Sequence, residues 1–77
     1  MNKHEKEWEK GFGARLKAIR KKLGYTQASL AEKAGIAVSV ISDFECSRRL
    51  PSLTNIYRLV LALHVSADCL FPKEKQA

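Results

Sequence analysis

Apolar residues in the first third of the chain recur at steps of three and four, and basic residues occupy the opposite face. This is the spacing of an amphipathic helix, and it predicts a helix from about His4 to Leu23 that stops at Gly24. Gly11 and Gly13 weaken the middle of this predicted helix. The apolar series is Trp8, Phe12, Leu16, Ile19 and Leu23.

The middle third predicts two short helices joined by a tight turn. Thr26 is a suitable N-cap for a helix that ends near Ala34, and the next helix spans roughly Val38 to Cys46. Gly35 falls in the turn, where a left-handed residue is needed and glycine adopts that conformation without steric cost. Ala37, at the N-cap of the second helix, offers no side-chain acceptor. Such a pair can place its second helix in a DNA major groove.

The last third predicts one long helix and one short one. Pro51 and Ser52 indicate the start of a helix from about Leu53 to Leu63. This helix is apolar nearly all round, which is typical of a central helix or of a helix in an interface. Ser66 is expected to cap a short fifth helix, which Pro72 ends. No period-two strand pattern competes. The prediction is an all-α, five-helix single domain over residues 1–77, with residues 1–7 and 73–77 frayed.

The net charge of +6 is unevenly placed. Acidic and basic residues cancel in residues 1–14 and again in residues 59–77, so the whole excess lies between Arg15 and Arg58. A basic surface on the same region as the helical pair favours a polyanionic partner. The alternative is a solvated basic face that keeps the protein soluble.

Other classes of protein find little support in the sequence. The N-terminus has no signal peptide, and the longest apolar run, residues 59–63, is too short to span a bilayer, so we expect a cytoplasmic protein without a membrane partner. Cys46 and Cys69 do not have the spacing of a metal-binding motif or of a redox-active cysteine pair. They are either two reduced thiols or, together with His4 and His64, a zinc site. We expect two reduced thiols and no metal. Without a catalytic arrangement or a phosphate-cradling glycine loop, we expect no enzyme, cofactor or small-molecule effector.

Several motifs together resemble the Xre-type helix-turn-helix family, to which phage repressors and Cro belong. They are R-L-K-A-I-R from Arg15, G-Y-T-Q-A-S-L-A from Gly24, A-G-I-A from Ala34, I-S-D-F-E from Ile41, R-R-L-P-S-L from Arg48 and V-S-A-D-C-L-F from Val65. The resemblance covers roughly residues 12–71. It implies a compact five-helix domain, typically a homodimer on a palindromic operator, that acts as a transcriptional regulator.

The resemblance also implies a set of DNA contacts. Gln27 corresponds to a residue that binds a phosphate or braces a base-contacting side chain, and Val38 corresponds to a base-facing position. Val40 either contacts DNA or turns back toward the core. Asp43 either accepts from a cytosine amino group or pairs with an arginine of the following loop, Arg48 or Arg49. The full predicted DNA-binding set is Thr26, Gln27, Ala37, Val38, Ser39, Val40, Ser42, Asp43, Ser47, Arg48 and Arg49.

Other positions are assigned structural roles by the same resemblance. Arg20 and Glu45 match an ion pair that ties the first helix to the end of the third. Where the family often has glycine, this chain has Ser47, and serine adopts a left-handed conformation only at a cost. Cys46, in the same loop, is either an inert thiol or a redox switch that a bound phosphate masks.

The far end of the domain is the expected dimer surface. It comprises Val65, Leu70 and Phe71, with exposed parts of the fourth helix; the alternative is that these residues only close the core of one chain. Trp8 either packs under the fifth helix or extends the interface.

Two functions remain open from the sequence. The first is a sequence-specific regulator that binds double-stranded DNA as a homodimer. The second is a protein-interaction module on the same fold, which the apolar Val38 and Val40 and the acidic Asp43 favour. Arg48, Arg49 and the localised positive charge argue against this second function.

Overall fold

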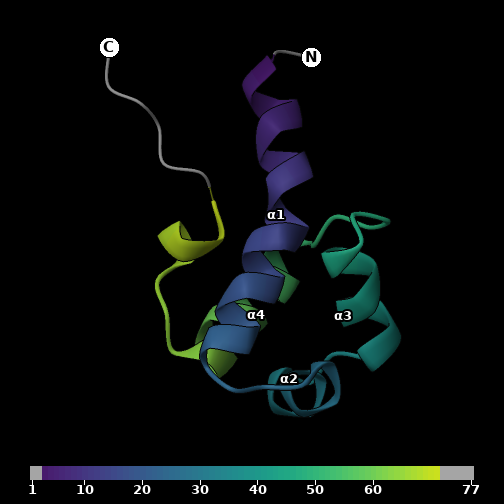
Figure 1. Ribbon diagram of the computed structural model, residues 1–77, viewed down its shortest axis with the longest axis vertical. Coiled ribbons are helices and arrows are strands. Elements are labelled where there is room, and N and C mark those ends of the chain that lie inside the picture. Colours follow the sequence, from purple (N-terminus) through teal and green to yellow (C-terminus); the bar gives the residue numbers. More distant parts are fainter. Residues whose placement is uncertain (1–2, 72–77) are drawn as a thin grey trace.

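The computed structural model describes the backbone of residues 3–71 and the side chains of residues 11–71. Its elements are α1 (Lys3–Lys22), α2 (Gln27–Ala34), α3 (Val38–Glu45), α4 (Leu53–Leu63) and the 3-10 helix η1 (Ala67–Leu70) (Figure 1). Residues 3–71 contain no strand. The predicted all-α fold is confirmed. The predictions for the Trp8 side chain, His4, Pro72 and residues 73–77 lie outside the described residues.

The helix boundaries follow local chemistry. Thr26 accepts a hydrogen bond from the Ser29 amide at the start of α2, and Gly35 ends that helix in the left-handed region at φ 70°. Ser52 accepts from the Asn55 amide at the start of α4. Ala37 leaves α3 without a side-chain cap, as its chemistry requires.

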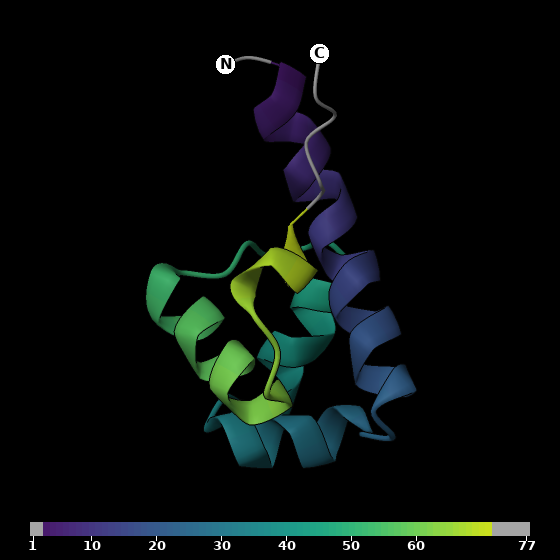
Figure 2. The same cartoon turned by 90° about the vertical axis from the view of Figure 1, so that its left-hand side faces the viewer.

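The fifth element differs from the sequence prediction. It is a four-residue 3-10 helix, and Ser66 makes no capping hydrogen bond to its backbone; the Ser66 hydroxyl lies 4.0 Å from the Cys69 sulfur. Figure 2 shows η1 against α1 and α4, where Leu70 is inserted completely into the core. A short segment that must bury one leucine between two helices is shaped by that packing rather than by its cap.

One core joins all five elements. Phe12 of α1 and Phe44 of α3 meet edge to face with ring centroids 6.1 Å apart. Leu23, expected on the apolar face of the first helix, instead lies beyond α1 and is 46% exposed. Among residues 11–71, the largest side chains that are fully buried are Phe12, Leu16, Leu30, Ile41, Phe44, Leu59 and Leu70.

Gly13 permits the close crossing of α1 and α3. A Cβ atom at this position would lie 2.8 Å from the carbonyl oxygen of Glu45 and closer still to that of Phe44. The sequence marks Gly13 only as a weak point of its own helix. Its role is to let the backbone of α3 approach α1.

Candidate nucleic-acid interface

Helix α2 is anchored at both ends. The Thr26 hydroxyl and the Ser29 side chain form a reciprocal capping box at the start of α2. At its other end, the carbonyl of Gly35 accepts a hydrogen bond from Arg58 Nη1 of α4 at 3.1 Å. The Thr26 side chain, predicted to contact DNA, is thus engaged in capping. The sequence indicates only the charge of Arg58, because no local pattern identifies a carbonyl 23 residues away as its hydrogen-bond acceptor.

The first turn of α3 presents its outer side to solvent. Ala37 and Ser39 are exposed, and Val38 is 48% exposed. Val40, one residue further along, is half-buried and packs against the core. Of the two roles open for Val40, the structure therefore shows the inward one. Ser42 is also half-buried.

A network of hydrogen bonds joins the C-terminal end of α3 to α1 and α2. Arg20 Nε donates to Glu45 Oε2 at 2.6 Å and Arg20 Nη2 donates to Glu45 Oε1 at 3.0 Å. Gln27 Nε2 donates to the same Oε1 at 3.0 Å, and Arg20 Nη1 donates to the carbonyl of Tyr25 at 2.9 Å. The two charged side chains are only 8% and 2% exposed. Three elements are thus joined at one carboxylate, and Gln27 braces the end of α3.

The network also determines the ionisation of Glu45. Burial by itself would raise the pKa of this carboxyl, but hydrogen bonds from Arg20 and Gln27 outweigh it and leave the pKa below its ordinary value. The bond to Glu45 raises the pKa of the Arg20 guanidinium in turn. Both groups are therefore charged at neutral pH.

The loop after α3 carries a second charged cluster. Ser47 adopts the left-handed conformation at φ 62°. Arg48 Nε donates to Asp43 Oδ1 at 3.0 Å, and Arg49 Nε lies 3.5 Å from Asp43 Oδ2. The arginine side chains are 61% and 55% exposed. Of the two roles open for Asp43, the structure shows the pairing with the loop.

Apart from the half-buried Ser42, the predicted residues thus fall into two groups. Those that form an open surface are Ala37, Val38, Ser39, Ser47, Arg48 and Arg49, with Asp43 between them; those engaged within the fold are Thr26, Gln27, Val40, Arg20 and Glu45. Leu70 is corrected from the predicted dimer surface, because it is fully buried within one chain. Val65 and Phe71 are half-buried and pack against the same core.

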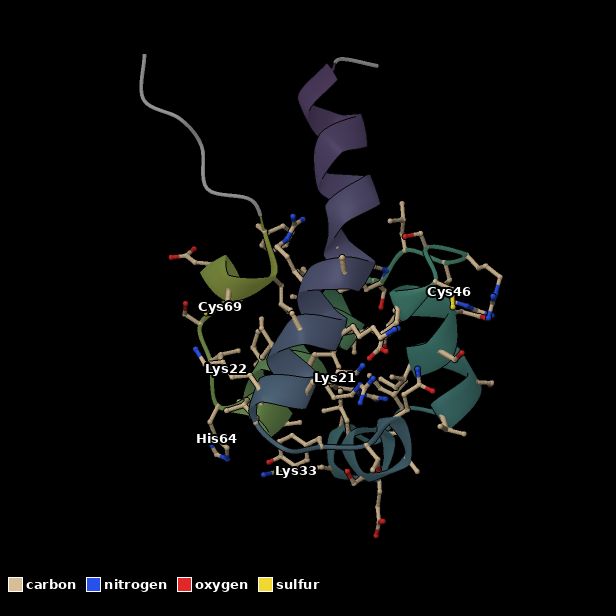
Figure 3. The ribbon with its side chains drawn as sticks, in the orientation of Figure 1. Lys21, Lys22, Lys33, Cys46, His64 and Cys69 are labelled. Atoms are coloured by element: carbon tan, nitrogen blue, oxygen red, sulfur yellow. The ribbon has the colours of Figure 1, made fainter. Side chains whose placement is uncertain are left out.

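The cysteines do not meet. Figure 3 shows Cys46 next to α3 and Cys69 on η1, with α1 between them, and both are free and exposed. Among the residues that the structure describes, no group of three or more potential ligands could hold a metal ion. No helix in this part of the chain has the length and apolar character needed to cross a membrane.

Comparison with known proteins decides the family. The family model for helix-turn-helix proteins (HTH_3) matches residues 16–68, which contain α2, α3, the following loop and α4. The chain belongs to this helix-turn-helix family. The motifs quoted from the sequence therefore identified the correct family.

Relatives of this helix-turn-helix protein are regulators by name. The uncharacterized HTH-type transcriptional regulator YazB of Bacillus subtilis (strain 168) is 44% identical over 64 residues, which are 83% of this chain and 93% of YazB. The immunity repressor protein of Bacillus phage phi105 is 39% identical over 62 residues, which are 80% of this chain and 43% of the repressor. This chain thus spans less than half the length of the phage repressor.

Two solved structures share the fold. The restriction-modification controller protein C.AhdI from Aeromonas hydrophila has a TM-score of 0.76 and 37% identity, over 78% of this chain and 91% of C.AhdI. SinR, the master regulator for biofilm formation, was solved in complex with DNA; it has a TM-score of 0.72 and 38% identity, over 77% of this chain and 98% of that chain.

Proposed function

We propose that this protein is a transcriptional regulator that binds double-stranded DNA, with α3 in the major groove. The observation that carries the proposal is the placement of α3. Hydrogen bonds from Arg20 and Gln27 to the carboxylate of Glu45 fix its C-terminal end. At its N-terminal end, Ala37, Val38 and Ser39 are exposed to solvent. A recognition helix needs this combination, because base contacts require a rigid element with a free outer face.

The exposed side chains of α3 suit a base edge. Val38 can contact a thymine methyl group, and the Ser39 hydroxyl can donate to or accept from a base or a phosphate. Arg48 and Arg49 flank this face from the loop, where they can contact the DNA backbone. The regulator names of the relatives and the DNA complex of SinR support the same function.

We also propose that the protein acts as a homodimer through α4. Leu53, Tyr57 and Leu61 follow each other at steps of four, so they form one stripe, and they are 84%, 62% and 55% exposed. A stripe of large apolar side chains on a small domain is typical of an interface. A two-fold dimer would place two α3 helices in successive major grooves about 34 Å apart, on half-sites about 10 bp apart.

The proposal places this helix-turn-helix domain in the cytoplasm and assigns it no catalysis, cofactor or small-molecule effector.

Selection of bound sequences from a random duplex pool tests the function. At about 150 mM salt, where purely electrostatic association is weak, we expect enrichment of a palindrome. The paired variant Arg48→Gln with Arg49→Gln should weaken binding to all duplexes and reduce the salt dependence, because phosphate contacts are lost.

A protein-interaction module is the second candidate, and the exposure of Val38 on α3 favours it. A folded, dimeric protein that enriches no sequence would contradict DNA recognition and support this candidate. The loop variant separates the two as well, since neutral residues at positions 48 and 49 should leave an apolar protein contact through Val38 intact.

A further inference from the structure

Asp43 is an acidic residue in an unfavourable place. It lies in the last turn of α3, where the partial negative charge of the free carbonyl groups disfavours a carboxylate. No basic residue of α3 compensates it there. The compensating charges come from the loop, since each oxygen of the carboxylate faces its own arginine, Arg48 at 3.0 Å and Arg49 at 3.5 Å.

The loop backbone brings these arginines back to the helix. The left-handed Ser47 turns the chain, and its amide donates to the carbonyl of Phe44 at 3.2 Å. The Arg48 amide then donates to the carbonyl of Asp43 at 2.8 Å. Arg48 is therefore joined to Asp43 through both its main chain and its side chain.

The carboxylate also shares the outer side of α3. Asp43 follows the exposed Ser39 by four residues, so the two lie one above the other on the helix surface. The Asp43 side chain keeps 28% of its surface accessible. A polyanion that approaches α3 thus meets this negative charge together with the two arginines.

We propose that Asp43 is a selectivity residue: in the free protein its carboxylate pairs with Arg48 and Arg49, which a DNA phosphate would contact in a complex. This inference rests on the proposed function. Phosphate contacts supply the binding to DNA of any sequence, so an internal carboxylate weakens association with random DNA. A cognate operator offsets this loss through base contacts. Because exposed ion pairs have a small net strength, phosphates displace the carboxylate rather than being excluded by it.

The variant Asp43→Asn tests the inference, since it keeps the shape of the side chain and removes its charge. At about 150 mM salt we expect the affinity for a random-sequence duplex to rise about twofold to thirtyfold, the range for losing two exposed ion pairs. The plot of log affinity against log salt should steepen by up to about 0.9. In the wild-type protein the displaced carboxylate takes up a cation and so offsets one cation released from the DNA, and Asp43→Asn removes this uptake. The selected palindrome should gain less, so the ratio between the two affinities falls.

Two controls separate this role from net charge and from folding. Asp68→Asn makes the same change of net charge on η1, and it should change neither the affinity for random DNA nor the salt slope as much as Asp43→Asn does. In the Arg48→Gln, Arg49→Gln background, Asp43→Asn should have no more effect than Asp68→Asn, because the partners are gone. Asp43→Ser, with melting curves for each variant, provides the same readout should the amide perturb α3.

Two results would overturn the inference alone. One is an unchanged affinity for random DNA and an unchanged salt slope in folded Asp43→Asn and Asp43→Ser. The other is a loss of palindrome binding with random binding unchanged, which would make Asp43 an acceptor for a cytosine amino group. If the wild-type protein binds neither duplex, the proposed function itself is wrong and the inference is overturned with it.

Discussion

At the scale of single residues, the backbone of this domain carries two non-glycine residues in the left-handed region, Ser47 at φ 62° and His64 at φ 57°. An L-residue in that region costs about 1–2 kcal/mol. Ser47 lies in the turn that directs Arg48 toward α3, so this strained residue is part of the candidate interface. The position is one where glycine is expected from the family resemblance.

Ser47→Gly should therefore stabilise the protein. Glycine adopts φ near 60° without strain, and after its larger loss of chain entropy we expect a gain of about 0.5–1 kcal/mol in the free energy of unfolding. Denaturant unfolding measures this change. Ser66→Gly is the matched control, because Ser66 has an ordinary φ of −79° and makes no capping bond, so glycine should destabilise there. Equal effects at both positions would contradict the explanation.

Glu45 joins the end of α3 to α1 and α2 through Arg20 and Gln27. Its folded pKa lies below the ordinary value of 4.5, so the stability that it contributes is fully present above that value. This contribution is lost as the pH falls through the folded pKa. The wild-type protein should therefore lose stability in acid below about pH 4.5, whereas Glu45→Gln should show a flatter profile over the same range.

At neutral pH, Glu45→Gln should cost about 3–5 kcal/mol, because it leaves the guanidinium of Arg20 buried without a counter-charge. Unfolding by denaturant at pH 7 and pH 4 measures both effects. Replacing both partners, Arg20→Met with Glu45→Leu, should cost much less than the single change. A double variant as unstable as Glu45→Gln would show that the pair itself, not an unpaired charge, dominates.

At the scale of elements, α1 and α3 cross with their backbones close together at Gly13. Helix propensity alone favours alanine over glycine by about 1 kcal/mol. A Cβ atom here meets carbonyl groups of α3, which are backbone and move only with the whole helix. The close approach therefore outweighs the propensity.

Gly13→Ala should destabilise the domain by about 1–3 kcal/mol, the usual range for overpacking. It should also disturb α3, and with it the Arg20–Glu45 pair. Gly11→Ala is the comparison, because the added Cβ meets side-chain atoms of Arg15 rather than backbone. The Arg15 Nε donates to the carbonyl of Leu70 at 3.0 Å, so we expect a smaller loss at Gly11 that reflects only the shift of this side chain. Thermal melting measures both variants. Similar stability of the two would mean that the helices separate without cost.

Local signals made most of the fold predictable. Thr26, Gly35 and Ser52 begin or end helices through their own chemistry, so both ends of α2 and the start of α4 follow from the sequence. The 3-10 form of η1 and the role of Gly13 were not predictable, because both depend on contacts with distant elements. At the site, the Arg20–Glu45 pair came from the family resemblance, and no local pattern pointed to it.

At the scale of the whole molecule, the apolar stripe of α4 lies outside the core of the single chain. Leu53, Tyr57 and Leu61 contribute large apolar surfaces that one chain leaves in contact with water. A domain of 77 residues buries only about 60% of its unfolded surface, so a second copy would add needed burial. The predicted dimer surface thus loses Leu70 and keeps the exposed part of α4.

Leu53→Ser with Leu61→Ser should convert the dimer to a monomer, and sedimentation equilibrium measures the change. The affinity for the selected palindrome should fall steeply in the same variant, because the second half-site is no longer bound by the same molecule. Leu23→Ser removes another exposed leucine, 46% exposed and just beyond α1, and should leave the mass of the assembly unchanged. A dimer that survives the double change would place the interface elsewhere.

The most direct test of the whole account is a parallel selection from random duplexes with the wild-type protein and the variants Val38→Ala and Ser39→Ala. If α3 contacts bases, each variant remains folded but loses preference at a defined position in each half-site, by about 1–3 kcal/mol for the base concerned. The remainder of the palindrome should stay the same. Variants that select the wild-type palindrome unchanged would contradict the claim that the outer face of α3 recognises DNA.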